Sequence, residues 1–152
     1  MKRNSIHFEV LEEGKVQPVL DALSGMLSKM DDDVSMETSF LILPNGFNSF
    51  SSYLKLVDAA ERFLKKNNYE GVYQVASFHP DYLFAGSKLN DPANYTNRSP
   101  YPMLHILREE SLSRAIESYP DTNKIPEKNI AFARQKGLLY MQTLRSACMD
   151  VE

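Results

Sequence analysis

The chain begins with two segments in which apolar side chains recur at different spacings. Residues 5–11 alternate apolar and polar side chains, and this period of two predicts an edge or half-buried strand with His7 opposite the apolar set. From Val16 the apolar side chains recur every three or four residues, which predicts an amphipathic helix over residues 16–30. The aspartates at 31–33 are expected to form a solvated turn, since consecutive aspartates cannot all face one metal ion.

The same order of strand and helix then repeats. Residues 39–43 are a serine and four consecutive apolar residues closed by Pro-Asn-Gly, as expected for a buried strand followed by a turn. Helical spacing resumes over residues 50–64, with Asn48 or Ser49 as the N-cap. A third strand is predicted over residues 72–78. This β-α-β-α-β order favours a small, mostly parallel α/β sheet flanked by helices.

Residues 103–109 fit two structures. Ser99 before Pro100 is a common helix start, with serine as the N-cap and proline at the first helical position, so a helix is favoured. The alternation of Leu104 and Ile106 is instead typical of a fourth strand. Both alternatives stay open at this point.

The C-terminal part of the chain is predicted to be helical. A helix can run over residues 111–119, a turn follows at Pro120, and Pro126 opens a last helical stretch that Gly137 breaks or kinks. No internal repeat or interdomain linker is present, so residues 1–152 are expected to form a single domain.

Composition and charge exclude several functional classes. The formal net charge is −3 and the basic residues do not cluster along the sequence, so no nucleic-acid partner is expected. No apolar run has the length of a membrane span, so no membrane partner is expected either. The N-terminus lacks a secretory signal and Cys148 is the single cysteine, which favours a cytoplasmic location. No pattern identifies a cofactor or an oligomeric state.

The polar connection after the third strand holds the candidate functional residues. Residues 77–109 contain two of the three histidines, and long polar loops on a rigid scaffold often carry function. His79 and Asp81 would lie at the C-terminal end of a strand, where parallel α/β sheets bind ligands. In a helix, His105 and Glu109 would share one face.

Three interpretations of these four side chains remain. His79, Asp81, His105 and Glu109 could together bind zinc, iron or manganese. Without a metal they could act as a catalytic acid–base pair, since a carboxylate tunes a neighbouring histidine. They could also form structural hydrogen bonds only, because no compact motif such as HExxH is present.

A second polar group predicts binding of a small anionic ligand. Arg98 supplies a forked donor for carboxylate or phosphate, and its place before the expected helix start suits an anion. The other members of this group are amides, hydroxyls and a second arginine: Asn94, Thr96, Asn97, Ser99 and Arg108. Alternatively, the amide and hydroxyl side chains satisfy the loop's own backbone, which leaves Arg98 without a role.

Three phrases of the sequence resemble one bacterial family. ETSFLILP (37–44), ASFHPDYLFAG (76–86) and NYTNRSPYPMLHILRE (94–109) are similar to the family called domain of unknown function 1415. The resemblance implies a small soluble protein and no particular activity. Family members generally have an upstream Leu-Cys-Pro-Phe-like segment, and the chain begins without it, as expected for a shortened or divergent form. Leu43 also stands where members often have a histidine before the proline.

Two functions follow from this sequence. The favoured prediction is an enzyme-like protein that binds a small anionic ligand at residues 79–109, with histidine and carboxylate chemistry. The alternative is a non-catalytic binding or interaction module in which the same segment is a rigid, internally hydrogen-bonded loop. Convergence of the two histidines in one cleft would favour the first, whereas separate backbone partners would favour the second.

Overall fold

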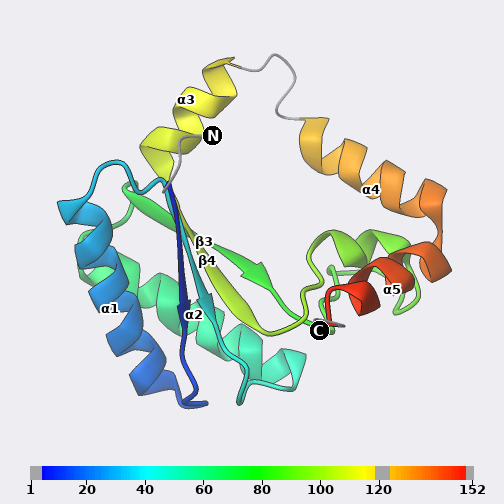
Figure 1. Cartoon of the computed structure of the whole chain (residues 1–152), viewed down its shortest axis with the longest axis horizontal. Coiled ribbons are helices and arrows are strands. Elements are labelled where there is room, and N and C mark those ends of the chain that lie inside the picture. The colour runs from blue at the N-terminus through cyan, green and yellow to red at the C-terminus, as the bar shows by residue number, and fades with distance from the viewer. Residues whose placement is uncertain (1–4, 119–123, 150–152) are drawn as a thin grey trace.

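The computed structural model describes residues 5–118 and 124–149 (Figure 1). Strands and helices alternate up to β3, a short 3-10 helix (η1) precedes the last strand, and helices follow. The elements are β1 (Ile6–Val10), α1 (Val16–Asp32), β2 (Thr38–Ile42), α2 (Phe50–Lys66), β3 (Tyr73–Phe78), η1 (Pro92–Thr96), β4 (Met103–Arg108), α3 (Glu109–Ser118), α4 (Ile125–Lys136) and α5 (Leu138–Ala147). Among these helices, none is both long and apolar enough to cross a membrane.

The four strands form one sheet in the order β1-β2-β4-β3. β1 and β2 are parallel, whereas β4 lies antiparallel to both of its neighbours, β2 and β3. The predicted α/β class is therefore confirmed, but the prediction of a mostly parallel sheet is wrong, because the last strand inserts between two strands that run in the opposite direction.

Residues 103–108 are strand β4, so the favoured helix over this segment is wrong and the alternative strand is confirmed. Leu104 and Ile106 are completely buried, as the alternation of β4 requires. The Ser99 hydroxyl donates to the carbonyl of Tyr101 at 2.6 Å instead of capping a helix. Pairing with two neighbouring strands stabilises the extended backbone, and this tertiary effect overrides the local Ser-Pro signal.

Several local predictions are confirmed. The Ser49 hydroxyl caps α2 by accepting from the Ser52 N–H at 3.2 Å, and Gly137, with φ of 83°, separates α4 from α5. The turn expected at Pro120 lies outside the described residues. The turn expected at 31–33 is corrected in part, since α1 continues through Asp32.

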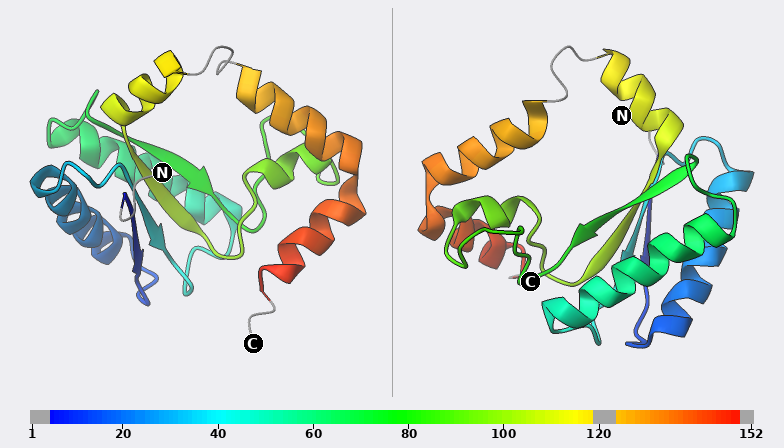
Figure 2. Two further views of the ribbon diagram at one scale, coloured as in Figure 1. Left: turned by 45° about the horizontal axis from the view of Figure 1, so that its top comes forward. Right: turned by 180° about the vertical axis from the view of Figure 1, so that it is seen from behind.

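Helices α1 and α2 cover one face of the sheet (Figure 1). Their apolar stripes and the strands form the core, whose largest fully buried members are Leu23, Met26, Leu27, Met30, Leu41, Leu43, Tyr53, Leu56, Tyr73, Leu104 and Ile106. α3 continues from β4, and α4 and α5 lie beside η1, away from α1 and α2 (Figure 2).

The other face of the sheet, here called the open face, carries three side chains from each strand. By the strand register these twelve are Ile6, Phe8, Val10, Thr38, Phe40, Ile42, Gln74, Ala76, Phe78, Met103, His105 and Leu107. None of them is buried, whereas their neighbours Leu41 and Leu104 on the opposite face are fully buried. The apolar side of β1 thus faces away from the core.

Candidate functional site

His79 is fully buried beyond the end of β3. Its Nε2 lies 2.9 Å from the carbonyl of Phe47, and its Nδ1 accepts from the N–H of Asp81 at 2.9 Å. An Nδ1 that accepts leaves the ring proton on Nε2, which donates to the carbonyl. The ring also packs against Phe50 and Tyr53 of α2, so both nitrogens are engaged on the helix-covered side.

His105 lies on the open face, in the middle of β4. Its ring stacks on Phe40 at 3.9 Å between centroids, and Nε2 is 2.5 Å from the Thr38 hydroxyl. That hydroxyl donates to the carbonyl of Ile106, so it accepts from the imidazole. Burial lowers the pKa of His105 to about 4, and the ring is therefore neutral at neutral pH.

The structure does not bring the four predicted catalytic residues together. His79 packs on α2, whereas His105 lies on the opposite side of the sheet. The side chain of Asp81 is exposed, and Glu109 begins α3. Over residues 5–118 and 124–149, no three His, Cys, Asp or Glu side chains form a group that could hold a metal ion. This geometry supports the structural interpretation of the four residues.

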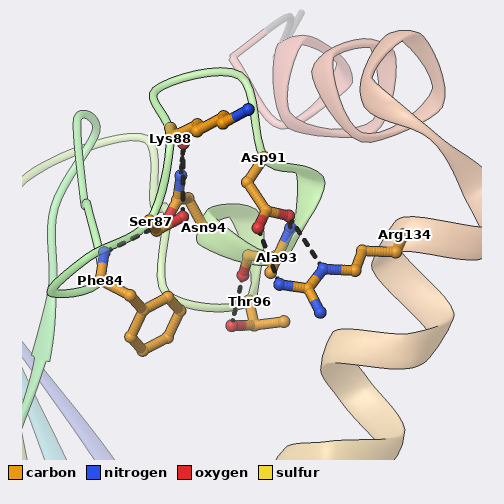
Figure 3. Close-up of polar contacts among 8 residues, drawn as sticks. All are labelled: Phe84, Ser87, Lys88, Asp91, Ala93, Asn94, Thr96 and Arg134. Carbon is orange, nitrogen blue, oxygen red and sulfur yellow. Dashed lines mark hydrogen bonds and ion pairs between the residues drawn. The ribbon is translucent and has the colours of Figure 1, made fainter.

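Asn94 organises the loop between β3 and β4 (Figure 3). Its side chain is fully buried, with Oδ1 accepting from the N–H of Phe84 at 3.1 Å and Nδ2 donating to the carbonyl of Lys88 at 2.8 Å. The amide therefore satisfies two backbone groups of a segment that makes no strand or helix. This is the role that a buried asparagine takes in a rigid loop.

The neighbouring polar residues also bond to backbone groups. The Thr96 hydroxyl donates to the carbonyl of Ala93 at 2.8 Å, and Asn97 Nδ2 donates to the carbonyl of Ser77 at 3.1 Å. Ser99 bonds to Tyr101, as described above. The contact of Asn97 attaches the end of η1 to β3, whereas those of Thr96 and Ser99 are local.

Both predicted anion-binding arginines donate to carbonyl groups. Arg98 Nε donates to Tyr82 at 3.1 Å and Nη2 donates to Leu89 at 3.3 Å. Arg108 donates to the carbonyl of Met30 in the last turn of α1, where a cation is favourable, and to the carbonyl of Met36 in the segment before β2. Each arginine thus has a structural role that the sequence did not reveal.

An ion pair that the sequence analysis missed joins α4 to this loop (Figure 3). Arg134 donates to both carboxylate oxygens of Asp91, at 3.1 and 2.8 Å, while Asp91 also caps η1 through the N–H of Ala93. The hydrogen bonds from Arg134 and from this N–H lower the pKa of Asp91 to about 2. Asp91 directly before Pro92 was a cap signal, but its pairing with a residue 43 positions away has no local signature.

Two other missed residues support the sheet from the helix side. The Tyr53 hydroxyl donates to the carbonyl of Met103 at 2.8 Å and accepts from the N–H of Phe78 at 2.9 Å, so it bridges β3 and β4. Asp31, expected in a solvated turn, accepts from the hydroxyls of Tyr69 and Tyr73 at 2.9 and 2.7 Å. Burial first, and then this bond, raise the pKa of Tyr73.

Together these observations define a small α/β protein with a mixed four-stranded sheet, helices α1 and α2 on one face, and a polar loop held by its own hydrogen bonds. The chain belongs to the family described as Protein of unknown function (DUF1415), which matches residues 1–143. No curated protein and no solved structure matches the chain significantly.

Proposed function

We propose that this protein is a non-catalytic protein-interaction module that binds its partner on the open face. The observation that carries the proposal is that twelve side chains in four strands include no charged group, since burial keeps His105 neutral. Phe8 and Val10 are 60% and 56% exposed. The other side chains of this face are apolar except Thr38, Gln74 and His105, and a largely apolar surface without charge is typical of an interaction site.

The partner that fits is a protein with an uncharged, apolar helical surface. On the opposite face of the same sheet, α1 and α2 cover the four strands with two amphipathic stripes. The open face is formed by the same four strands as the helix-covered face. It has no charged group that a partner would have to neutralise. Helices that pack on a sheet bury apolar side chains in the same way within and between chains.

The loop at residues 79–109 supports the non-catalytic function. His79 and Asn94 are fully buried with backbone partners, and Arg98 donates to two carbonyls. A side chain that already satisfies the loop is not available for acid–base work. The loop instead holds η1 and α4 against the end of the sheet.

Photocrosslinking in the natural host tests the open face. A photoreactive phenylalanine analogue at Phe8 should give a discrete adduct with one protein other than a second copy of this chain, and the same analogue at Val34, which is 79% exposed outside the open face, should not. In a chain with the analogue at Phe8, Phe40→Asp should abolish the adduct, whereas Val34→Asp should leave it unchanged. Equal adducts from positions 8 and 34, or an adduct insensitive to Phe40→Asp, would contradict the proposal.

A second candidate function is binding of a small anion between two arginines. Arg98 and Arg145 line the same cavity of about 130 Å³, next to Tyr95. Arg98 lies over the Tyr95 ring at 4.5 Å, and Arg145 donates to the carbonyl of Pro80 at 3.1 Å. Two guanidinium groups at one small cavity suit a phosphate or carboxylate.

Thermal unfolding with added phosphate tests this candidate. Bound phosphate should raise the midpoint for the wild type and for Arg114→Ala, a control on the exposed side of α3, but not for Arg98→Ala. The same increase in all three proteins would exclude Arg98 as the anion-binding residue. An effect of sodium sulfate equal in all three would identify a general salt effect.

A further inference from the structure

We propose that β1 pairs antiparallel with β1 of a second copy of this chain, with Phe8 opposite Phe8 on a twofold axis. The pairing would join two four-stranded sheets into one. It goes beyond the function proposed above and does not depend on it, because it uses the edge of the sheet and not its open face.

The outer edge of β1 has backbone groups directed away from the sheet. The N–H of Leu11 donates to Ile42 at 3.0 Å, and the carbonyl of Ser5 accepts from Thr38 at 3.2 Å. In a parallel pair, alternate residues of a strand bond to the neighbour, so odd-numbered residues face β2. The N–H and carbonyl groups of Ile6, Phe8 and Val10 therefore point outward, and β1 is an edge strand of the sheet that the described residues form.

The two edges of the sheet differ. At the β3 edge, Asn97 Nδ2 donates to the outward carbonyl of Ser77 at 3.1 Å, so the polar loop covers part of that edge. β1 carries no proline and no lysine, the residues that commonly protect an edge from pairing. Its outward residues also include the most exposed side chain of the open face, Phe8.

An antiparallel pairing centred on Phe8 uses all of these outward groups. Ile6 then lies opposite Val10 of the second copy, and Val10 opposite Ile6. Opposite residues of such pairs exchange two hydrogen bonds each, which gives about six bonds across the interface. Side chains directly opposite each other share one face of a sheet, so Phe8 and its apolar neighbours meet their counterparts.

His7 and Glu9 are complementary in this register and in no neighbouring one, because each imidazole then lies opposite a carboxylate. His7 lies opposite Glu9 of the second copy, and Glu9 opposite His7, on the helix-covered face. Within one chain, His7 Nε2 is buried without a hydrogen-bond partner among the described residues and lies 3.6 Å from Glu9 Oε2. In this register, Glu9 of the second copy brings another carboxylate opposite the imidazole, in addition to the one 3.6 Å away in the same chain.

Helix α1 leaves room for the second copy. Lys29 contacts Glu9 at 3.1 Å, which places that side of α1 next to β1. Gly25 lies one turn earlier on the same side of α1. A Cβ added at Gly25 would have no atom within 4 Å, so the space beside it is open. Two α1 helices can therefore approach each other above the joined strands.

The dimer also enlarges the apolar surface. One open face covers about 300 Å² in projection at ordinary strand spacing and rise. A twofold axis perpendicular to the sheet places both open faces on the same side. The two faces then form one continuous surface of about twice the area.

Sedimentation and disulfide trapping test the pairing. The wild type should sediment as a dimer in equilibrium with monomer. Val10→Pro should be monomeric, because it removes an outward N–H and no bond between β1 and β2, whereas Val10→Thr keeps the N–H and should still dimerise. His7→Glu should weaken the dimer about tenfold by placing like charges opposite each other, and His7→Gln should not.

Trapping reports the register directly. In a Cys148→Ser background, Phe8→Cys should form an intermolecular disulfide, since opposite residues of a hydrogen-bonded pair have Cα atoms about 5.5 Å apart, and Val34→Cys should not. Circular dichroism confirms that each variant is folded. A wild type that stays monomeric at every concentration, a dimer unaffected by Val10→Pro, or open-ended assembly would each overturn the proposal. If the wild type dimerises but photocrosslinking at the open face traps no other protein, only the proposed function is contradicted.

Discussion

His105 is a neutral side chain on an uncharged surface, and its titration links that surface to stability. Burial lowers its pKa from 6.5 to about 4. Between these values the unfolded chain binds more protons than the folded chain, so the free energy of unfolding should rise as pH increases from 4 to 6.5. Because the ring is partly exposed, we expect about 1–2 kcal/mol.

Urea unfolding from pH 4 to 8 measures this contribution of His105 to the free energy of unfolding. The wild-type profile should be steeper than that of His105→Gln in the window from pH 4 to 6.5, while the carboxylates contribute equally to both. Parallel profiles would show that the imidazole is hydrated and readily protonated on the open face.

Asn94 supports a structural role for the polar loop at the scale of one residue. Asn94→Ala should lower the free energy of unfolding by about 1–3 kcal/mol, because it leaves the Phe84 N–H and the Lys88 carbonyl without their partner in a buried place. Asn90→Ala, at an exposed position of the same loop, is the matched control. Chemical denaturation measures the free energy of unfolding of both variants. Equal values would argue that Asn94 contributes to ligand binding and not to stability.

At the scale of elements, α4 is attached to η1 by the ion pair between Arg134 and Asp91. Arg134→Met should increase amide hydrogen exchange across α4 without changing β2 and β4, because the pair lies outside the sheet. Arg114→Met, which breaks an ion pair within α3, should leave α4 unchanged. Unaltered exchange in α4 would mean that apolar contacts alone hold it.

The same pair has a defined pH dependence. The pKa of Asp91 is lowered from 3.8 to about 2, so the stabilisation is present above the unfolded value and is lost as pH falls towards the folded one. Wild-type α4 should therefore gain exchange only in strongly acidic solution. Mass spectrometry at several pH values measures the amide hydrogen exchange of α4. Arg134→Met should already show the increased exchange at neutral pH.

At the scale of the whole molecule, β1 pairing makes stability depend on concentration. If only folded chains pair, the midpoint of thermal unfolding should rise with protein concentration by mass action. Val10→Pro should lose this dependence and Val10→Thr should keep it. Calorimetry over about a hundredfold range of concentration is a sufficient test, and a constant wild-type midpoint would contradict dimerisation.

Local signals in the sequence were sufficient for the α-helices and three of the four strands, but not for η1. Regular apolar spacing located α1 and α2, Asn48 and Ser49 were the two candidate caps of α2, of which Ser49 is the cap, and Gly137 identified the break before α5. The segment at 103–108 was ambiguous, because a Ser-Pro helix signal and an alternating apolar pattern overlap there. Only pairing with β2 and β3 decides between them.

The candidate site shows where residue types alone are insufficient. Histidines, carboxylates and arginines close together in sequence suggested one cleft, yet β4 carries His105 to the open face while the end of β3 carries His79 to α2. A strand places successive side chains on opposite faces. Which face each histidine occupies therefore depends on sheet register, and register is a tertiary property.

The sequence by itself determined the α/β class, the position of the helices and the polar loop, because these follow from apolar period, caps and glycines near each other in the chain. Only the tertiary structure decided the strand order, the direction of β4, the use of Arg98, Arg108 and Asn94 as backbone partners, and the uncharged open face. The physical reason is that each of these depends on contacts between residues far apart in sequence, whose formation depends on burial and strand pairing and not on local preference.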